Sequence, residues 1–359
     1  MHKIMLSMLM LLTSMALVGT VTYEVSLGSK EIVQRGEYVS IQMAGAHVNG
    51  EAGQPALPWI GIKLLLPVGT KATEIKVERQ GAERLRLDKT LSPIQEQYPI
   101  SMAETPELTT PDPTIYKTNA VFPQTPHTGV YTQYLSGHPI FFSAVCPFDY
   151  NPVTGELLSY STVRVTVETA TDKDSPVQYG LLKEDIHTRD RLIRSVDNPQ
   201  DVPRYTLPSQ GYDYIIIYDS AKYAQWLPLK TLYDTRGYNV LMKPIQDIYA
   251  QYTGASNPVK IRNFLIAMYA NNAIRYVLLA GDTEVIPYRG LYATVGNYTN
   301  ASIPADIYYA SLDGNWNSNG NTYWGELGEA DLVPEFAIGR VSYNDDTEIA
   351  NFLAKLTNY

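Results

Sequence analysis

The side chains that usually carry nucleophilic catalysis are missing from the second half of this sequence. Residues 212–359 contain no histidine and no cysteine. Acyl transfer needs a base beside the nucleophile, so a Ser–His or Cys–His centre cannot be assembled from these residues alone. The single cysteine, Cys146, ends an apolar run, which favours a half-buried strand cysteine over a nucleophile paired with His138. No position is therefore assigned a catalytic role.

An asparagine-rich stretch offers oxygen ligands at regular spacing. The pattern Asn-x-Asn-x-Asn-Gly-x5-Glu follows an EF-hand loop, with asparagine in the first position. Alternating oxygens and a distal glutamate can surround Ca²⁺, and Gly320 permits a sharp turn. The spacing predicts a weak structural calcium site, and the alternative is a solvated hairpin loop. The predicted ligands are Asp313, Asn315, Asn317, Asn319, Asn321 and Glu326.

The pair Gly281-Asp282 closes a buried apolar run at residues 276–280. At the carboxyl end of a parallel strand, glycine permits close approach and aspartate can accept hydrogen bonds or bind a cation. The alternative is a simple turn in which Asp282 caps the next element. No strand is followed by G-x-G-x-x-G, and G-x-S-x-G is absent, so a dinucleotide fold and a serine-hydrolase elbow are both disfavoured.

The elements that would position these side chains form an α/β pattern from residue 211 onward. Apolar runs at residues 214–218, 238–242, 276–280 and 336–338 predict strands buried on both faces. Between them, Asn257-Pro258 opens an amphipathic helix, and Pro228 is expected to open a second helical piece. Alternating strands and helices predict a mostly parallel sheet with right-handed crossovers.

Residues 21–175 follow a different pattern. Short β-rich runs, several alternating apolar with polar residues, are separated by proline and glycine signals. The fold class predicted for this part is all-β and sandwich-like. The proline-rich stretch from Pro93 to Pro126 is expected to be an extended loop over the surface of this domain.

Residues 176–210 are expected to be an exposed linker between the two domains. Polar, proline-containing segments of this kind are where domains separate and where proteases cut. The arginines in it are candidate cleavage sites, although an ordinary solvated linker would have the same composition. They are Arg189, Arg191, Arg194 and Arg204.

The start of the sequence and its charge indicate where the protein works. Residues 1–20 have a basic start at Lys3, an apolar run and then small residues, which predicts a signal peptide; a membrane anchor is the alternative. We therefore expect a secreted or cell-surface protein. The formal net charge is −9 without a basic cluster, which argues against a nucleic-acid partner.

Several motifs together resemble the gingipain-like cysteine peptidases, family C25. They are RYVLLAGDTEVIPYRG at residues 275–290, preceded by a helix with IRNFLIAMYAN, and EFAIGRVSYNDDTEIANFLAKLTNY at residues 335–359. Segments such as GQPALPWIGIKLLLPVGT and CPFDYNPVTGEL resemble the family's propeptide. The resemblance extends over nearly all of the sequence after residue 20.

The resemblance implies a secreted zymogen with a caspase-like α/β catalytic domain. The family's propeptide covers the active site as an intramolecular inhibitor, and it is removed by cleavage, often after a basic residue. The catalytic histidine and cysteine belong to a second subdomain, and we expect them beyond residue 359. The substrates implied are proteins or peptides, and the chain by itself is expected to be inactive.

Two other functions fit the same residues. One is a C25-like component of a secretion system, which would process or attach other exported proteins. The other is a non-enzymatic surface module, in which a β-domain and a calcium-stabilised α/β domain bind glycans or proteins.

Overall fold

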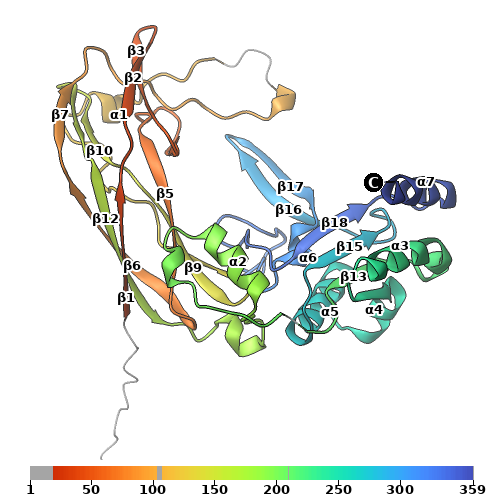
Figure 1. The fold of residues 1–359 in the computed structure, drawn as a ribbon. Helices are drawn as coiled ribbons and strands as arrows, with labels where there is room; N and C mark the ends of the chain where they lie inside the picture. Colours follow the sequence, from red (N-terminus) through yellow and green to blue (C-terminus); the bar gives the residue numbers. More distant parts are fainter. Residues whose placement is uncertain (1–18, 103–106, 209, 359) are drawn as a thin grey trace, which may run out of the picture.

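In the first half of the chain, buried side chains alternate with more exposed ones along the strands. The structure is a computed structural model that describes residues 19–102, 107–208 and 210–358 (Figure 1). In β12, Val163, Val165 and Val167 are buried while the residues between them are not. The strands of this half are β1 (Gly19–Ser26), β2 (Lys30–Arg35), β3 (Tyr38–Met43), β4 (Ala46–Val48), β5 (Pro58–Leu65), β6 (Thr70–Gln80), β7 (Glu83–Arg86), β8 (Tyr131–Leu135), β9 (His138–Val145), β10 (Phe148–Asn151), β11 (Glu156–Ser159) and β12 (Thr162–Thr171).

These strands build the predicted sandwich. The antiparallel sheet β1–β12–β6 packs against the antiparallel sheet β4–β5–β9–β8. Their shared core includes Val165 from the first sheet and Leu64 and Phe141 from the second. A second core, around Trp59 and Tyr150, lies toward the smaller sheet β10–β11–β7 and the hairpin β2–β3.

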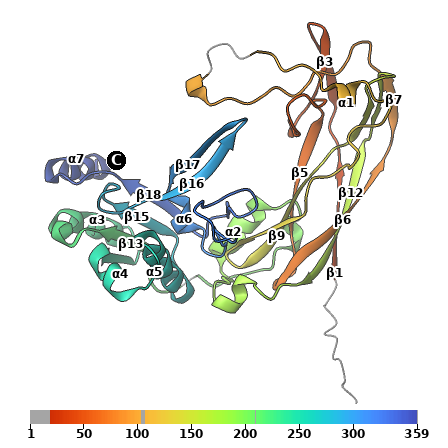
Figure 2. The same ribbon diagram turned by 180° about the vertical axis from the view of Figure 1, so that it is seen from behind.

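Residues 93–126 leave the sandwich and return to it as a long strap. Within it lie only the short helices η1 (Ile100–Met102) and α1 (Pro113–Tyr116) among the described residues. Figures 1 and 2 show the strap reaching over toward the second half of the molecule. The sequence predicted a loop over the surface of its own domain, whereas the strap extends beyond that surface.

The second half contains the predicted parallel sheet. Its order is β14–β13–β15–β18, and each neighbouring pair is parallel. The run at residues 214–218 is buried throughout, as expected for a central strand. The elements are β13 (Tyr214–Tyr218), η4 (Ser220–Lys222), α3 (Tyr223–Thr235), β14 (Val240–Pro244), α4 (Ile245–Gln251), α5 (Asn257–Asn271), β15 (Tyr276–Ala280), β16 (Arg289–Val295), β17 (Tyr298–Ala305), α6 (Ile307–Ala310), β18 (Ala337–Val341) and α7 (Asp346–Thr357).

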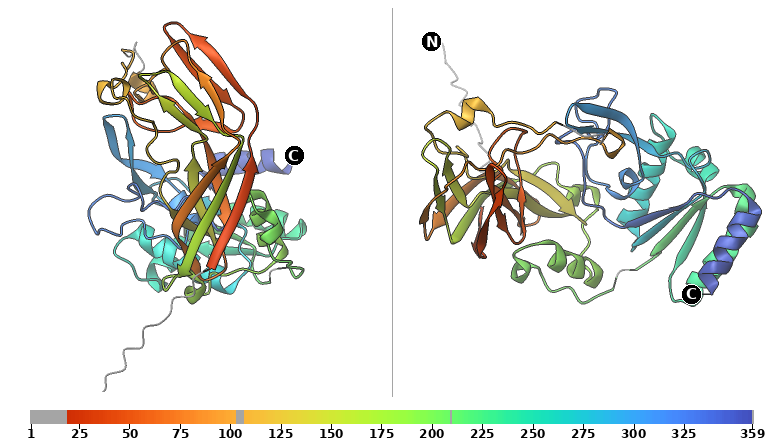
Figure 3. Two further views of the ribbon diagram at one scale, coloured as in Figure 1. Left: turned by 90° about the vertical axis from the view of Figure 1, so that its left-hand side faces the viewer. Right: turned by 90° about the horizontal axis from the view of Figure 1, so that it is seen from above.

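Helices cover both faces of this sheet (Figure 3). Helices α3 and α7 pack on one face through Trp226 and Ile349. On the other face, α5 contributes Ile261 and Leu265 to a larger core that includes α4 and α6. Pro228 was predicted to open a second helical piece, and this prediction is wrong. It lies inside α3, on the exposed side of the helix. The carbonyl of residue 224, which loses its helical partner, is at an exposed position and can be hydrated.

The connecting segment is folded rather than extended. It forms η2 (Pro176–Tyr179), α2 (Ile186–Ser195) and η3 (Pro199–Asp201). Leu192 of α2 is fully buried against Leu65, Leu135 and Ile140 of the sandwich. The segment does connect the two domains, but burial of this apolar face makes it a docked element instead of the free linker expected from its composition.

Among the described residues, no helix is both long enough and apolar enough to cross a membrane.

Candidate functional site

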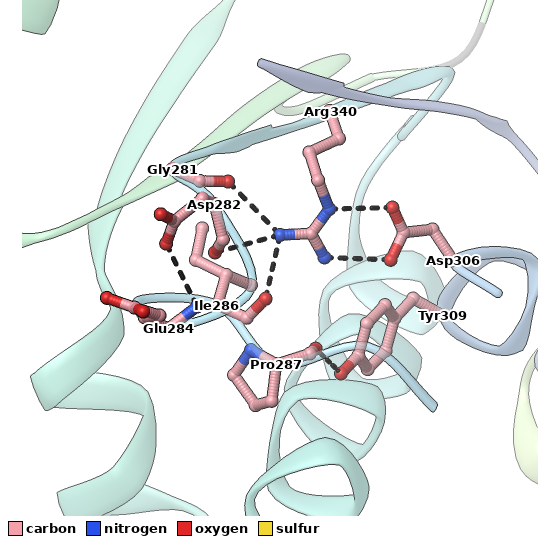
Figure 4. A network of polar contacts seen from close by, with 8 residues as sticks. All are labelled: Gly281, Asp282, Glu284, Ile286, Pro287, Asp306, Tyr309 and Arg340. Carbon is pink, nitrogen blue, oxygen red and sulfur yellow. Dashed lines mark hydrogen bonds and ion pairs between the residues drawn. The ribbon is translucent and has the colours of Figure 1, made fainter. Parts of the chain in front are cut away.

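One arginine organises the carboxyl edge of the parallel sheet (Figure 4). Arg340, on β18, donates from Nη1 to the carbonyl oxygens of Gly281, Asp282 and Ile286, at 3.1, 3.1 and 2.7 Å. Its Nε and Nη2 each donate to a carboxylate oxygen of Asp306, both at 2.8 Å. The guanidinium therefore fixes the turn after β15 to β18 and to the start of α6.

Asp282 in this turn acts as a cap. Its Oδ1 accepts hydrogen bonds from the backbone N–H groups of Glu284 at 2.9 Å and Val285 at 3.3 Å. Hydrogen bonding from Asn344, followed by these backbone donors, lowers the pKa of Asp282. Glycine is favoured at position 281 because its φ is +156°, which other residues rarely adopt, and a Cβ there would make a tight contact of 3.1 Å with Val285 Cγ1. Of the two roles that the sequence left open, the geometry supports the turn-capping one.

A second group of charged residues lies in the segment before β18. Carboxylate oxygens of Asp313, Asp331 and Glu335 all lie within 4.8 Å of one another. Glu335 is 2% exposed and Asp331 is 5% exposed. Asp313 Oδ2 and Glu335 Oε1 are buried without a hydrogen-bond partner in the part of the chain that the structure describes. We call these three residues the acidic trio.

The backbone around the acidic trio is held in place by fixed donors. Asp331 Oδ2 accepts from the N–H of Gly314 at 3.1 Å, and Arg262 donates to the carbonyl oxygens of Ser311 and Gly314, each at 2.9 Å from Nη2. A Cβ on Gly314 would lie 2.4 Å from Asp331 Cβ, so only glycine allows this approach. The carboxylates are thus brought together by a backbone that cannot easily relax.

Burial controls the ionisation of the trio. It raises the pKa of Asp313 and of Glu335 well above their usual ranges, and the neighbouring carboxylates raise both further. The guanidinium groups of Arg191 and Arg262 oppose the shift of Glu335, and protons or a bound cation would offset the charge that remains in such a buried cluster. Oxygen-only ligands in this number suit a hard cation such as Ca²⁺.

The structure separates the calcium ligands predicted from spacing. Asp313 belongs to the acidic trio, whereas Glu326 Oε2 accepts from the side-chain amides of Asn319 and Asn321, at 2.9 and 2.6 Å. The amide oxygens of Asn315, Asn319 and Asn321 accept backbone N–H groups two residues further on. Asn317 donates to the carbonyl of residue 321. These local bonds arise because asparagine readily closes such turns.

Two members of the trio were not singled out in the sequence. Asp331 and Glu335 are four residues apart and directly precede the β18 strand, and that acidic pair at a strand entrance was the available signal. Asp306 was also missed, because no spacing rule links it to Arg340. Only the fold brings these residues to their partners.

The single cysteine is unsuited to catalysis in this structure. Cys146 is 0% exposed, and burial raises the pKa of its thiol to about 12. His138 lies at the opposite end of β9, so the eight intervening steps of an extended strand place the two about 26 Å apart. Cys146 is more deeply buried than predicted, and it does not form a dyad with His138.

The four candidate cleavage arginines have different surroundings. Arg189, Arg191 and Arg194 all lie within helix α2. Arg191 is part-buried and donates to the carbonyl oxygens of Pro334 and Glu335. Arg204 alone of the four lies in an exposed segment without helical structure.

Comparison with family models divides the chain at this connector. The model for peptidase family C25 matches residues 207–359, and the model for the C25 propeptide matches residues 11–185. Residues 186–206, which contain α2, lie between the two matches. Together the two matches cover nearly all of the chain. A search of curated proteins found no match.

Several solved structures are similar to parts of the chain. One is described as a complex of the Porphyromonas gingivalis RgpB pro- and mature domains, with 19% identity, a TM-score of 0.38, and coverage of 50% of this chain and 93% of that one. A structure on the zymogenic latency of gingipain K from the same organism has 18% identity, a TM-score of 0.36, and coverage of 43% and 88%. The Arg-specific proteinase gingipain R has 23% identity, a TM-score of 0.30, and coverage of 41% of this chain but only 28% of its own.

Proposed function

Since the chain belongs to peptidase family C25, and consists of the family's propeptide followed by the start of its peptidase domain, we propose that it is part of a latent cysteine endopeptidase. Its substrates would be proteins or peptides, and its own propeptide would act as an intramolecular inhibitor. The observation that carries this proposal is the contact between the two halves. Arg191 of the connector donates to residues 334 and 335, and Gln133 of the sandwich donates to the carbonyl of Ala330 at 3.0 Å.

The strap supports the inhibitory role independently. The tip of the β16–β17 hairpin meets it, and a Cβ on Gly296 would lie 2.4 Å from Gln97 O. The rings of Tyr98 and Tyr298 lie 6.3 Å apart, between their centroids. The propeptide therefore contacts the peptidase part at two separated places, which supports its role as an intramolecular inhibitor.

By itself, this chain should not hydrolyse peptide bonds. Its one thiol is buried at Cys146 with a raised pKa of about 12, so almost no thiolate is present at neutral pH. Labelled casein incubated with the purified chain should be cut no faster than the buffer blank, and Cys146→Ala should change nothing. Hydrolysis that disappears in Cys146→Ala would overturn this proposal.

We propose Arg204 as the activation cleavage site. A protease needs its substrate extended, and the three other candidates are helical, whereas Arg204 is exposed and outside regular structure. In the intact precursor, Arg204→Gln should block both the new N-terminus at Tyr205 and the appearance of activity. Arg194→Gln is the matched control and should mature normally. Maturation of the Arg204→Gln precursor at the wild-type rate would contradict this assignment.

Export is the third part of the proposal. Residues 1–18, which carry most of the expected signal peptide, lie outside the described residues. Gly19 and Thr20, which were included in that signal, instead begin β1 and pair with Thr169 and Glu168. Cleavage directly before Gly19 would leave this strand whole. Mass spectrometry of the secreted protein should find the mature N-terminus at or before Gly19, and a start after residue 20 would contradict it.

We further propose that Ca²⁺ binds at the acidic trio and stabilises the peptidase part. Asp313, Asp331 and Glu335 would be its carboxylate ligands, and the two unpartnered oxygens support this. Calorimetric titration with CaCl₂ should show binding that Glu335→Gln abolishes and Glu326→Gln preserves. The opposite pattern would place the ion in the asparagine-rich loop. If the titration shows no heat of binding, neither site binds Ca²⁺.

A further inference from the structure

Helix α2 is attached to both halves of the molecule (Figures 1 and 3). On the sandwich side, Leu192 is fully buried, and the residues after the helix extend the attachment along β5. Asp197 Oδ2 accepts from the N–H of Lys63 at 2.7 Å, and Asn198 Oδ1 accepts from the N–H of Leu65 at 2.8 Å. The helix is therefore built into the propeptide domain, although it lies between the two family-model matches.

On the peptidase side, α2 is held mainly through Arg191, and His187 Nε2 makes a longer polar contact of 3.4 Å with Arg275 Nη1. Arg191 donates from Nη1 to the carbonyl oxygen of Glu335 and from Nη2 to that of Pro334. Val333 of the same segment packs against the apolar cluster that contains Leu192. The segment that α2 contacts is thus the one that leads into β18 and supplies the acidic trio.

We infer that α2 is a latch, anchored by Arg191, that keeps the propeptide on the peptidase part after the chain is cut at Arg204. This inference rests on the proposed function, because it describes how the same zymogen is regulated. A cut at Arg204 leaves α2 covalently joined to the sandwich, with all its contacts to residues 333–335 intact. Release of the propeptide therefore requires a second event, the undocking of α2.

Undocking also decides whether the arginines inside α2 can be cut. A protease needs several extended residues on both sides of the bond, so α2 must unfold locally first. Arg189 and Arg194 lie one turn or less from the anchor, but within the described residues neither forms a hydrogen bond or ion pair with the peptidase part. Arg189 Nη1 is 3.7 Å from Asp190 Oδ1, and Arg194 is exposed. Cleavage at Arg189 is therefore a reporter of the latch.

Limited digestion of the full chain with trypsin tests this inference. The wild-type protein should be cut first after Arg204, and the two pieces should still elute together in size-exclusion chromatography. Arg191→Met should accelerate cleavage after Arg189 by about tenfold or more, since it removes both hydrogen bonds from this charged donor to the peptidase part, along with a longer one of 3.5 Å to Ser136 Oγ of the sandwich. It should also let the nicked pieces separate. Arg194→Met, on the same helix, is the matched control and should behave like the wild type.

Two results would overturn the latch. One is separation of the wild-type pieces as soon as Arg204 is cut, and the other is a digestion pattern of Arg191→Met equal to that of Arg194→Met. If Arg191→Met does not fold, hydrogen exchange on the wild-type chain decides: residues 189–195 must be protected about as well as β13. Because trypsin makes the cut, the outcome does not depend on whether cleavage activates a peptidase, so failure of the latch and failure of the proposed function remain distinguishable.

Discussion

Arg340 and Asp306 form a two-pronged ion pair that closes the carboxyl edge of the parallel sheet. The distances from Arg340 Nε to Asp306 Oδ2 and from Nη2 to Oδ1 are both 2.8 Å. The side chain of Arg340 is only 11% exposed and that of Asp306 is 24% exposed. Because the same guanidinium also binds three carbonyl oxygens of the turn after β15, one side chain ties together β18, that turn and the entry to α6. The edge at which parallel sheets carry their chemistry is thus tied together by one side chain.

Loss of this pair should be strongly destabilising. Arg340→Met keeps the length of the side chain but leaves the Asp306 carboxylate half-buried without its cation, and we expect the free energy of unfolding to fall by about 3 kcal/mol. Arg84→Met is the control, because Arg84 and Glu156 are paired at 73% and 40% exposure and should contribute less than about 1 kcal/mol. Urea unfolding followed by circular dichroism measures both. Equal losses in the two variants would refute the argument.

The fold was largely predictable because its elements follow local periodicity. The buried run of β13 and the alternation in β12 are direct consequences of the number of faces each strand buries. Strand β14 was misplaced by two residues, since pairing with β13 sets its limits and the apolar run does not. Its predicted first residues instead lie before the strand, where Asn239 N donates to Asp213 Oδ1 at 2.8 Å.

The site was less predictable because it depends on contacts distant in sequence. Spacing alone grouped Asp313 with the asparagines that follow it, yet in the folded chain its carboxylate lies beside those of Asp331 and Glu335. In the same way, proline and arginine content predicted an exposed linker, while a single buried face, centred on Leu192, fixes α2 to the sandwich. A pattern of residue types cannot show which side chains tertiary packing will bury.

The acidic trio should make stability depend on pH when divalent cations are absent. Burial raises the pKa of Asp313 and Glu335, so the folded state binds more protons than the unfolded state above the ordinary carboxyl range. The contribution of the trio to the free energy of unfolding then falls as the pH rises above the ordinary carboxyl range toward the raised pKa values. Melting temperatures measured in EDTA across this range should show that fall, and saturating CaCl₂ should reduce it, because the ion favours the ionised carboxylates.

A variant isolates this contribution from that of His138. Burial lowers the pKa of His138, so its contribution rises with pH and opposes that of the trio. Glu335→Gln should therefore flatten or invert the slope, while Glu348→Gln, at an exposed position of α7, should leave it unchanged. An identical slope in wild type and Glu335→Gln would show that the trio does not retain protons.

Cys146 should be unreactive as long as the chain is folded. It is fully buried, and burial raises the pKa of its thiol to about 12, so neither access nor thiolate is available at pH 8. Ellman's reagent should release no chromophore within minutes from the native protein and one equivalent after addition of guanidinium chloride. Rapid labelling of the native protein would mean that the region after β9 opens readily.

Gly296 should be needed for the strap to rest on the β16–β17 hairpin. It has φ +56°, and a Cβ there would lie 2.4 Å from Gln97 O, so Gly296→Ala must push the strap away as well as strain the turn. Gly36→Ala is a closely matched control, because Gly36 sits in the β2–β3 turn at φ +62° with no atom within 4 Å of its would-be Cβ. Backbone strain of about 1 kcal/mol should be common to both variants. Only Gly296→Ala should increase amide hydrogen exchange in residues 95–98, because only there does the side chain displace the strap. Equal exchange in the two variants would show that the strap is held elsewhere.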